Sequence, residues 1–449
     1  MYYLTQKRSL RIPMPPQMRN DRNYFVSLSR LSRWLAERAE ELGATIVPET
    51  AAVKLLVSGG RVVGVRTGDR GRGRNGEELP NFEPGSDIRA RVTILAEGTL
   101  GHLTRAAVEQ FELGGQPQVY ALGVKEVWEV EKPLVPIIHT IGWPLRMGRR
   151  NREFGGSFIY PMGDNLVSLG MVVGLDYSDP ALSVHDLLQQ LKTHPRVRKI
   201  LDGGKRIAWG AKTIPEGGFQ ALPSRLHFPG GMLVGDAAGL VNVPALKGIH
   251  YAIESGRLAA ETAVEAVGPG ATAWTPGQLE SYDEAVRESF IWKDLRRERN
   301  LRPAFQHGFV MGSALAGLST VTLGRLPPRD LRLERDADAE LRSPGKRGYP
   351  RPDGALTFDK LSSVFASGNR SRDDAPSHIR VRQHVPRRLA EAWIHMCPAQ
   401  VYSIAEGEQG DLVKVEVTAS NCVQCGAITA KGGRLPMPEG GDGPEYTVM

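Results

Sequence analysis

The sequence predicts an α/β fold with α+β insertions, in which a partly parallel sheet is combined with an inserted antiparallel sheet. Two apolar runs, residues 92–96 and 232–234, each end beside a glycine and an acidic residue. Such runs are typical of parallel strands that are buried on both faces. Short strand-like segments between residues 116 and 195 indicate the antiparallel sheet, as in a substrate domain inserted into a doubly wound one.

Length and charge limit the classes of protein that fit. A chain of 449 residues is long enough for about three domains. Its net charge of +7 suits an anionic membrane surface or an acidic protein partner. We expect no nucleic-acid partner, because no motif for one accompanies the charge. The residues after Met1 lack the apolar core of a secretory signal and the three cysteines are odd in number, which argues against a disulfide framework and predicts a cytoplasmic-facing protein.

The first hundred residues predict one helix followed by paired strands. Apolar residues recur at helical spacing over residues 23–43, and alternation predicts strands at 53–57 and 62–65. The spacing G-x-G-x-x-G occurs at residues 71–76, but no helix follows it, so we interpret it as an excursion between strands. A dinucleotide-binding protein would carry a glycine-rich βαβ unit, and the sequence as given shows none. A misplaced start codon and a truncated relative both stay open as explanations.

The most informative stretch is residues 229–261, in which a strand, a Gly-Asp turn and an apolar helix follow one another. Gly235 and Asp236 end the strand, and the helix runs on toward residue 264. A carboxylate at such a strand end can accept a hydrogen bond from a ribityl hydroxyl. The helix N-terminus offers free N–H groups and positive dipole to a flavin ring. This stretch therefore predicts a flavin site.

Gly155 and Gly156 stand together within the antiparallel region. The absence of a Cβ lets the backbone come close to a flat ligand there. A β-bulge explains the same pair equally well from sequence alone.

Residues 308–324 form an uncharged segment that is short for a membrane span, which needs roughly 20 mainly apolar residues. Composition alone favours a buried helix. Basic residues on both sides favour instead a helix that lies in an anionic membrane surface. These flanking residues are Arg296, Arg297, Arg299, Arg302, Arg325 and Arg329. Residues 327–353, rich in charge and proline, predict an irregular linker.

All three cysteines lie in the last part of the chain. Cys422 and Cys425 form a C-x-x-C pair, and Cys397 precedes a proline further upstream. Soft thiolates with this spacing suit an iron–sulfur cluster or zinc. We therefore predict that these cysteines are metal ligands.

Taken together, these stretches resemble the electron-transfer flavoprotein:ubiquinone oxidoreductase family. The matching motifs follow one consistent order: IGWPL (141–145), GGSFIYP (155–161), GGKRIAWGAK (203–212), GMLVGDAAGLVNVPALKGIHYAIESGRLAAE, PDGALTFDKLSSV, CPAQVY, NCVQC and PEGGDGPEY. The resemblance implies an FAD-dependent flavoprotein of the two-dinucleotide-binding-domain type. It also implies an antiparallel quinone-binding sheet and a C-terminal ferredoxin-like iron–sulfur domain.

The resemblance further implies roles for particular residues. A quinone headgroup is expected against Gly155 and Gly156. Tyr251 stands where relatives carry a small hydroxyl residue, which we expect to alter the flavin potential rather than flavin binding. The residues expected to contact FAD are Ala96, Glu97, Gly98, Gly235, Asp236 and Asn242.

The cluster expected from the resemblance is of the 4Fe–4S type, held by Cys397, Cys422 and Cys425. Ile428 stands where the family has its fourth cysteine, and Ile cannot bind iron. A 3Fe–4S cluster, a four-iron cluster with a non-cysteine ligand such as His395, and a lost cluster all stay open. We favour a cluster held by three thiolates.

The expected domain division is a partial FAD-binding domain at 1–115, a quinone-binding sheet domain at 116–204, the continued FAD-binding domain at 205–290, a membrane-associating helix and linker at 291–350, and a ferredoxin-like domain at 351–449. By resemblance, electrons pass from reduced electron-transfer flavoprotein through the cluster and FAD to ubiquinone or menaquinone. The setting expected is the cytoplasmic face of a bacterial inner membrane, with monotopic attachment through residues 308–324. No catalytic acid or base is expected, because the cofactors carry the chemistry. Two alternatives are a truncated, flavin-free remnant that acts as a binding or scaffold protein, and a related FAD-dependent hydroxylase or prenyl reductase.

Overall fold

The computed structural model describes residues 1–19, 23–115, 117–134, 136–148, 152–268 and 277–449. The expected domain boundary at residue 116 lies outside these ranges.

The largest sheet has seven strands in the order β13-β9-β12-β11-β10-β1-β2. Their bounds are β1 (Tyr2–Leu4), β2 (Ser9–Arg11), β9 (Tyr120–Glu129), β10 (Ile138–Gly142), β11 (Gly155–Gly163), β12 (Leu166–Gly174) and β13 (Lys205–Pro215). Neighbouring strands are antiparallel except β1 and β10, which run parallel and pair Tyr2 with Thr140. Strands β9 to β12 confirm the predicted antiparallel insertion. Helix α3 (Val184–Lys192) packs on β9 and β12, and α4 (Pro195–Leu201) follows it.

A smaller sheet holds the two predicted buried strands. β8 (Thr93–Leu95) and β15 (Gly231–Leu233) run parallel with Leu95 opposite Leu233, and β14 (His227–Phe228) completes the sheet. Their side chains share a hydrophobic core with α5 (Ile249–Val267), α6 (Glu280–Glu288) and α7 (Phe290–Glu298). The carboxyl ends of parallel strands meet at one edge of a sheet. The loop after β8 and the turn after β15 therefore lie side by side.

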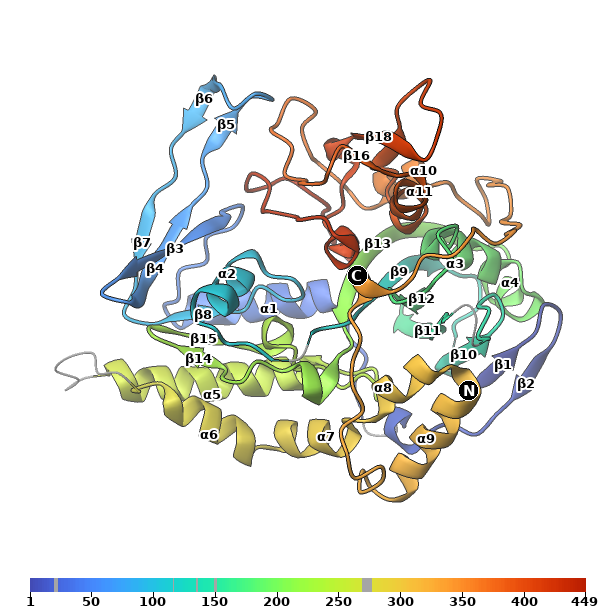
Figure 1. Cartoon of the computed structure of the whole chain (residues 1–449), viewed down its shortest axis with the longest axis horizontal. Helices are drawn as coiled ribbons and strands as arrows, with labels where there is room; N and C mark the ends of the chain where they lie inside the picture. Colours follow the sequence, from blue (N-terminus) through green and yellow to red (C-terminus); the bar gives the residue numbers. More distant parts are fainter. Residues whose placement is uncertain (20–22, 116, 135, 149–151, 269–276) are drawn as a thin grey trace.

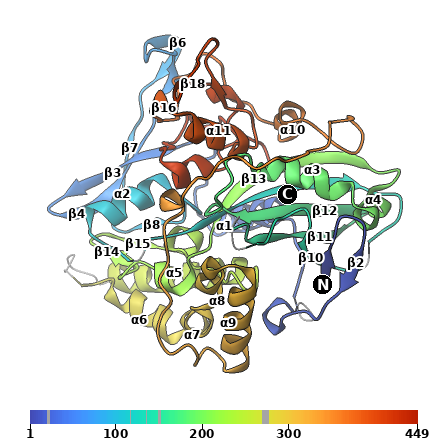
Figure 2. The same cartoon turned by 45° about the vertical axis from the view of Figure 1, so that its right-hand side comes forward.

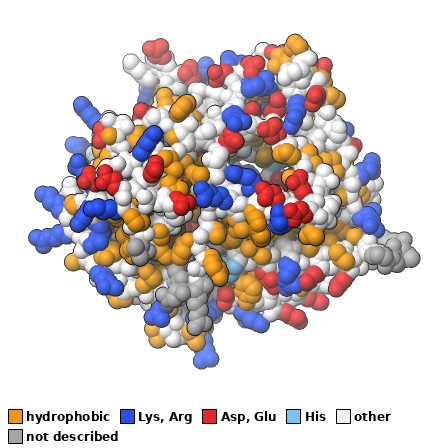
Figure 3. All heavy atoms as spheres, turned by 180° about the vertical axis from the view of Figure 1, so that it is seen from behind, with side chains coloured by type: hydrophobic (Ala, Val, Ile, Leu, Met, Phe, Trp, Pro, Cys, Tyr) orange, Lys and Arg blue, Asp and Glu red, His pale blue; other side chains and the backbone are white. Residues whose placement is uncertain are grey.

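Helix α1 (Leu28–Glu41) confirms the helix predicted over residues 23–43 but begins later. The Ser27 side chain accepts a hydrogen bond from the Arg30 N–H at 3.3 Å and so caps the helix. All of α1 is described, and none of its side chains is buried. Trp34 and Leu35 are among its exposed apolar residues. Helix α1 lies toward the back in Figure 1, and hydrophobic side chains gather in a band across that side of the molecule (Figure 3).

The G-x-G-x-x-G spacing lies in a peripheral hairpin, as predicted. β3 (Ala52–Ser58), β4 (Arg61–Thr67) and β7 (Asp87–Arg89) form a three-stranded sheet, from which β5 (Arg70–Arg72) and β6 (Glu78–Glu83) extend as a ribbon. The Gly76 N–H donates to the Gly73 carbonyl at 2.9 Å and tightens the turn between β5 and β6. These glycines therefore shape a turn and open no helix.

The C-terminal segment adds a small sheet and two helices that pack on the large sheet. These elements are α10 (Lys360–Ala366), β16 (His384–Pro386), α11 (Arg387–Met396), β17 (Tyr402–Ile404) and β18 (Leu412–Val417). One hydrophobic core includes Trp209 of β13 and Trp393 of α11. The cysteine-bearing segment therefore shares its core with the large sheet.

The remaining helices are short or connect these layers. They are α2 (His102–Gln110), α8 (Leu301–Ala304), α9 (Phe309–Val321) and the 3₁₀ turns η1 (Pro16–Met18), η2 (Gly218–Ala221), η3 (Gly235–Ala238), η4 (Phe305–His307), η5 (Asp336–Asp338), η6 (Ala419–Asn421) and η7 (Ala427–Lys431). Figure 1 shows the C-terminal layer above β13 and β9, with α5 to α9 along the lower side. The turned view places the β1–β2 hairpin beside β10, at the edge of the large sheet (Figure 2).

Candidate functional site

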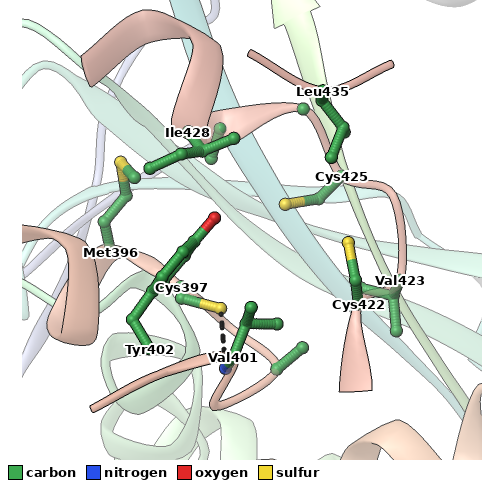
Figure 4. Close-up of a pocket in the computed structure, with 12 residues that line it drawn as sticks. Met396, Cys397, Val401, Tyr402, Cys422, Val423, Cys425, Ile428 and Leu435 are labelled. Carbon is green, nitrogen blue, oxygen red and sulfur yellow. Dashed lines mark hydrogen bonds between the residues drawn. The ribbon is translucent and has the colours of Figure 1, made fainter. Parts of the chain in front are cut away.

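The three cysteines line one pocket between α11, β17 and the loop before η7. Cys397 is the residue that ends α11, and Cys422 directly follows η6. The sulfur atoms of Cys397, Cys422 and Cys425 point toward the centre of this pocket, and the hydroxyl of Tyr402 points the same way (Figure 4). The structure therefore brings together all three cysteines that the sequence singled out.

Backbone N–H groups already face two of the sulfurs. The N–H of Val401 donates to the Cys397 sulfur and that of Gln424 to the Cys422 sulfur, each at 3.4 Å. Burial, followed by the neighbouring thiols, nevertheless raises the pKa of Cys422 and of Cys425, the latter to about 12. Three thiolates in this pocket therefore need a cationic partner, and the soft donor set fits iron in a cluster.

A single-ion site finds no support. Among the described residues, no three His, Cys, Asp or Glu side chains are arranged to hold one metal ion. A zinc site draws its thiolates to about 2.3 Å from a shared ion. The role of these cysteines as cluster ligands therefore stays a prediction.

Ile428 forms one wall of the pocket and is 5% exposed. It lies in η7, which follows Gly426 in the left-handed conformation with φ of 87°. A Cβ placed on Gly433 would overlap the Ile428 side chain. The chain therefore packs an apolar side chain closely at the position where the resemblance implied a fourth cysteine.

The predicted flavin turn places its acidic group beside a free helix end. Gly235 has φ of 55°, and its N–H donates to the Ser255 hydroxyl at 3.0 Å, which anchors the turn to α5. The Asp236 carboxylate accepts from the Thr99 hydroxyl at 3.4 Å. A Cβ on Gly248, the residue that begins α5 without a side-chain cap, would lie 3.4 Å from that carboxylate. Burial raises the pKa of Asp236, so a hydrogen-bond donor on a ligand would stabilise its charged form.

The loop after β8 meets this turn through Thr99. Gly98 has φ of 70°, and open space surrounds the position of a Cβ there. The Glu97 carboxylate has another role: it accepts the N–H groups of Leu103 and Thr104 at 3.1 and 2.6 Å and so caps α2. Ala96 and Gly98 therefore flank a capping residue, and a role in cofactor binding for residues 96–98 stays a prediction.

Asn242 makes its hydrogen bonds within the protein. Its amide N–H donates to the Tyr251 hydroxyl at 3.1 Å, and its oxygen accepts from the Ala245 N–H at 3.0 Å. The Tyr251 hydroxyl in turn donates to Asp294 at 3.3 Å. The bulky phenol at position 251 thus engages the amide that the resemblance assigned to the flavin ring, and that assignment stays a prediction.

Strand β13 connects the cysteine pocket to the flavin turn. The Thr213 N–H and hydroxyl donate to the Cys425 carbonyl at 2.8 and 2.9 Å. The Lys212 ammonium donates to the Gln424 carbonyl at 3.1 Å and interacts electrostatically with Cys422, Cys425 and Asp236. A lysine on one strand therefore faces both candidate cofactor sites.

The loop after β8 reaches the cysteine loop as well. A Cβ on Gly426 would lie 2.9 Å from Leu100 and 2.8 Å from the Thr213 hydroxyl. Sequence reasoning missed Leu100, Lys212, Thr213 and Tyr402. Lys212 and Tyr402 stood inside the motifs GGKRIAWGAK and CPAQVY, but spacing alone gives no direction for their side chains.

Gly155 and Gly156 begin β11 in regular register with β12. The register shift between these two strands lies further on, between Pro161 and Gly163. The β-bulge interpretation of this pair is therefore wrong. A Cβ on Gly155 would overlap the Val172 carbonyl, and one on Gly156 would lie 2.6 Å from the Thr140 carbonyl. Close approach of the neighbouring strands thus already requires glycine here.

The strand that carries this pair begins next to the apolar segment. The ring of Phe154 packs on Phe305 with centroids 4.8 Å apart, and Phe305 packs on Phe309 at the start of α9. Val310 and Val321 of α9 are 83% and 84% exposed. Within residues 308–324 the helix α9 (Phe309–Val321) is therefore largely exposed, and the buried-helix interpretation is wrong. Each helix in the described part of the chain is too short or too polar to span a bilayer.

Three family models match this chain. "FAD binding domain" matches residues 5–135, "ETF-QO, ubiquinone-binding" matches residues 120–214, and "Electron transfer flavoprotein-ubiquinone oxidoreductase, 4Fe-4S" matches residues 354–447. The second range covers β9 to β13, and the third covers the cysteine pocket.

Curated relatives match over nearly the whole chain. The mitochondrial electron transfer flavoprotein-ubiquinone oxidoreductase of Oryza sativa is 40% identical over 472 residues, covering 100% of this chain and 79% of that protein. The mitochondrial enzyme of the same name from Homo sapiens is 39% identical over 474 residues, covering 99% and 76%. Among solved structures, a geranylgeranyl bacteriochlorophyll reductase-like protein from Thermoplasma acidophilum aligns with a TM-score of 0.48 at 20% identity, covering 70% of this chain and 68% of that one.

Proposed function

The chain belongs to the electron transfer flavoprotein-ubiquinone oxidoreductase family, and from this premise we propose that it passes electrons from an electron-transfer flavoprotein to a quinone at a membrane surface. It is an FAD-dependent oxidoreductase with an iron–sulfur domain, which confirms the predicted fold class and cofactors. When bound, the cluster and FAD supply one- and two-electron chemistry. The chain's own residues bind, orient and shield these groups.

The observation that carries the proposal is that the cysteine loop contacts the loop after β8, which in turn reaches the flavin turn through the Thr99–Asp236 hydrogen bond. Thr213 holds the Cys425 carbonyl at 2.9 Å, and Leu100 lies against Gly426, one residue beyond that cysteine. Electron transfer needs cofactors at short distance and no acid–base pair. The short path from the cysteine loop through the loop after β8 to Asp236 supports the proposed reaction.

We assign the cofactor ligands from the geometry. Cys397, Cys422 and Cys425 hold the cluster, with the Tyr402 hydroxyl available to donate to a sulfur. Asp236 accepts a hydrogen bond from the ribityl chain of FAD, at the N-terminus of α5. Lys212 places a positive charge between the two groups, which stabilises added electrons in either.

We place the quinone and the membrane three strands away from β13 across the same sheet, where Gly156 lies at the same level along the strands as Lys212. Gly155 and Gly156 lie beside the Phe154–Phe305 contact at the base of α9, so a quinone entering along α9 reaches the glycine pair. The exposed apolar residues of α9 suit shallow insertion, and the exposed Arg296, Arg297, Arg325 and Arg329 suit anionic lipid, as on the cytoplasmic face of a bacterial inner membrane. The expected lipid-facing role of Arg302 is wrong, because Arg302 is buried in ion pairs with Asp176 and Glu216, and Arg299 is paired with Asp330. Ubiquinone and menaquinone both fit this description.

The test separates membrane access from electron transfer. The holoenzyme, reduced by electron-transfer flavoprotein, is given either quinone in anionic vesicles or a soluble dye. The double variant Val310→Asp/Val321→Asp is expected to bind vesicles at least tenfold more weakly, because about 1.5–3 kcal/mol per valine is lost, and to lose quinone reduction while keeping dye reduction. Val264→Asp, at a 66% exposed position on α5, serves as the matched control. Undiminished quinone reduction by the double variant would refute the role of α9, and failure of the wild type to reduce quinone would refute the function.

A further inference from the structure

This chain has three cysteines, whereas a four-iron cluster is usually held by four. A 4Fe–4S cluster is held by four cysteine thiolates, one for each iron. The whole sequence contains three cysteines, and all three line the pocket next to Ile428. The pocket therefore offers three thiolates among the described residues.

The position opposite the three sulfurs is filled rather than vacant. Ile428 is buried, and Gly433 provides the space that its side chain occupies. The other residues on this side, such as Leu435 and Ala427, are apolar. An iron placed there would face hydrocarbon and no side-chain donor from these residues.

The remaining polar atoms of the pocket are weak substitutes. Among the described lining residues, Tyr402 carries the sole side-chain oxygen, and a phenol stays protonated near neutral pH. Met396 offers a thioether, which is a weak acceptor beside a thiolate. His395, considered above as a substitute ligand, does not line the pocket, and its carbonyl lies 3.4 Å from the Lys360 ammonium.

We infer that this chain carries a 3Fe–4S cluster, in which Cys397, Cys422 and Cys425 hold one iron each. Ile428 fills the space that the fourth iron and its thiolate would occupy in a 4Fe–4S cluster. The inference rests on the proposed function, because it takes the cysteine pocket to be the cluster site. Oxidised, such a cluster holds three ferric ions with an odd number of d electrons, so it is paramagnetic. An oxidised 4Fe–4S cluster has an even number and can be diamagnetic. Electron paramagnetic resonance therefore distinguishes the two.

The test uses the full-length holoenzyme, loaded anaerobically with iron, sulfide and FAD. We expect three irons to four sulfides and a resonance signal in the oxidised protein that disappears on one-electron reduction. Ile428→Cys is expected to take up a fourth iron, to lose the signal when oxidised and to show one when reduced. Ile428→Val, which changes side-chain volume without adding a thiolate, is expected to keep the three-iron signature.

Four irons in the wild type with no oxidised signal would overturn the inference, as would an Ile428→Cys variant with the wild-type stoichiometry. A wild type that binds no iron would overturn it too. The FAD content of the same samples separates these results from a failure of the proposed function, since a protein without flavin and without iron fails both, whereas a flavin-loaded protein fails only the cluster inference.

Discussion

Replacing Lys192 by Met should destabilise the protein markedly, because it breaks a fully buried ion pair. Lys192 and Glu126 are both 0% exposed, and the ammonium lies 2.8 Å from the carboxylate. Glu126 would keep the Trp128 indole at 2.7 Å, the Gln189 amide at 3.1 Å and the Arg206 guanidinium at 3.6 Å. Breaking a buried pair costs about 3–5 kcal/mol. Because these partners remain, we expect Lys192→Met to lower the free energy of unfolding by about 3 kcal/mol, the lower end of that range.

The control variant replaces both members of the Lys192–Glu126 ion pair by neutral residues. In Glu126→Gln/Lys192→Met the Lys192–Glu126 pair is replaced by neutral groups, while Arg206 loses its carboxylate partner at 3.6 Å and keeps the Ser363 hydroxyl at 2.8 Å and the Ser362 carbonyl at 3.2 Å. Part of the lost stability should therefore return, since neutral replacement of buried pairs is often tolerated. Lys205→Met, at an exposed end of β13, should change stability by less than about 0.5 kcal/mol. Equilibrium unfolding of the holoenzyme in guanidinium at pH 7 measures all three variants. A loss below about 0.5 kcal/mol in Lys192→Met, or a double variant less stable than the single one, would refute this account of the pair.

The other predictions concern the cofactor sites and one buried acid. Asp236→Ala should weaken FAD binding about ten- to hundred-fold, because a charge-assisted hydrogen bond contributes about 1.5–3 kcal/mol; titration of the apoprotein with FAD measures this, and an unchanged dissociation constant would remove Asp236 from the site. Lys212→Gln should lower the cluster midpoint potential by on the order of 60 mV, a tenfold change for one electron, whereas Lys205→Gln should leave it unchanged in a redox titration. Burial raises the pKa of Glu298 to about 7 from 4.5. The folded state therefore binds this proton more tightly, and wild-type stability falls as pH rises from about 4.5 to 7. Glu298→Gln should accordingly gain more stability over the wild type at pH 8 than at pH 5 in thermal unfolding, and an equal difference at both pH values would contradict the assignment.

Much of the fold could be predicted because many of its helices and strands have a recognisable local pattern of apolar and polar residues. The runs at 92–96 and 232–234 became β8 and β15, since a strand buried on both faces must be apolar throughout. The helix over residues 23–43 and the excursion at 71–76 were likewise visible in spacing and in missing context. Long-range pairing was not visible. Nothing local to Tyr2 indicates that β1 pairs with β10 at Thr140.

The sequence predicted which residues supply the donor atoms of the candidate site, but not where their side chains point. The three cysteines and Asp236 stood out by residue type and position. Glu97 was expected near the flavin from the resemblance alone, and nothing in the sequence indicated that its side chain also caps α2. The burial of Glu126 and Lys192 was not predicted, because sequence alone does not show that Phe358 of the C-terminal segment packs over the Lys192 ammonium.

The central claim, that this chain holds a flavin next to an iron–sulfur cluster, is tested most directly by the visible absorption spectrum of the protein purified from detergent-treated membranes without added cofactor. Our account predicts structured flavin bands that bleach on anaerobic reduction, above a broad absorption from the cluster. A colourless protein that also takes up no flavin on reconstitution would contradict the account and leave a flavin-free binding protein as the better description.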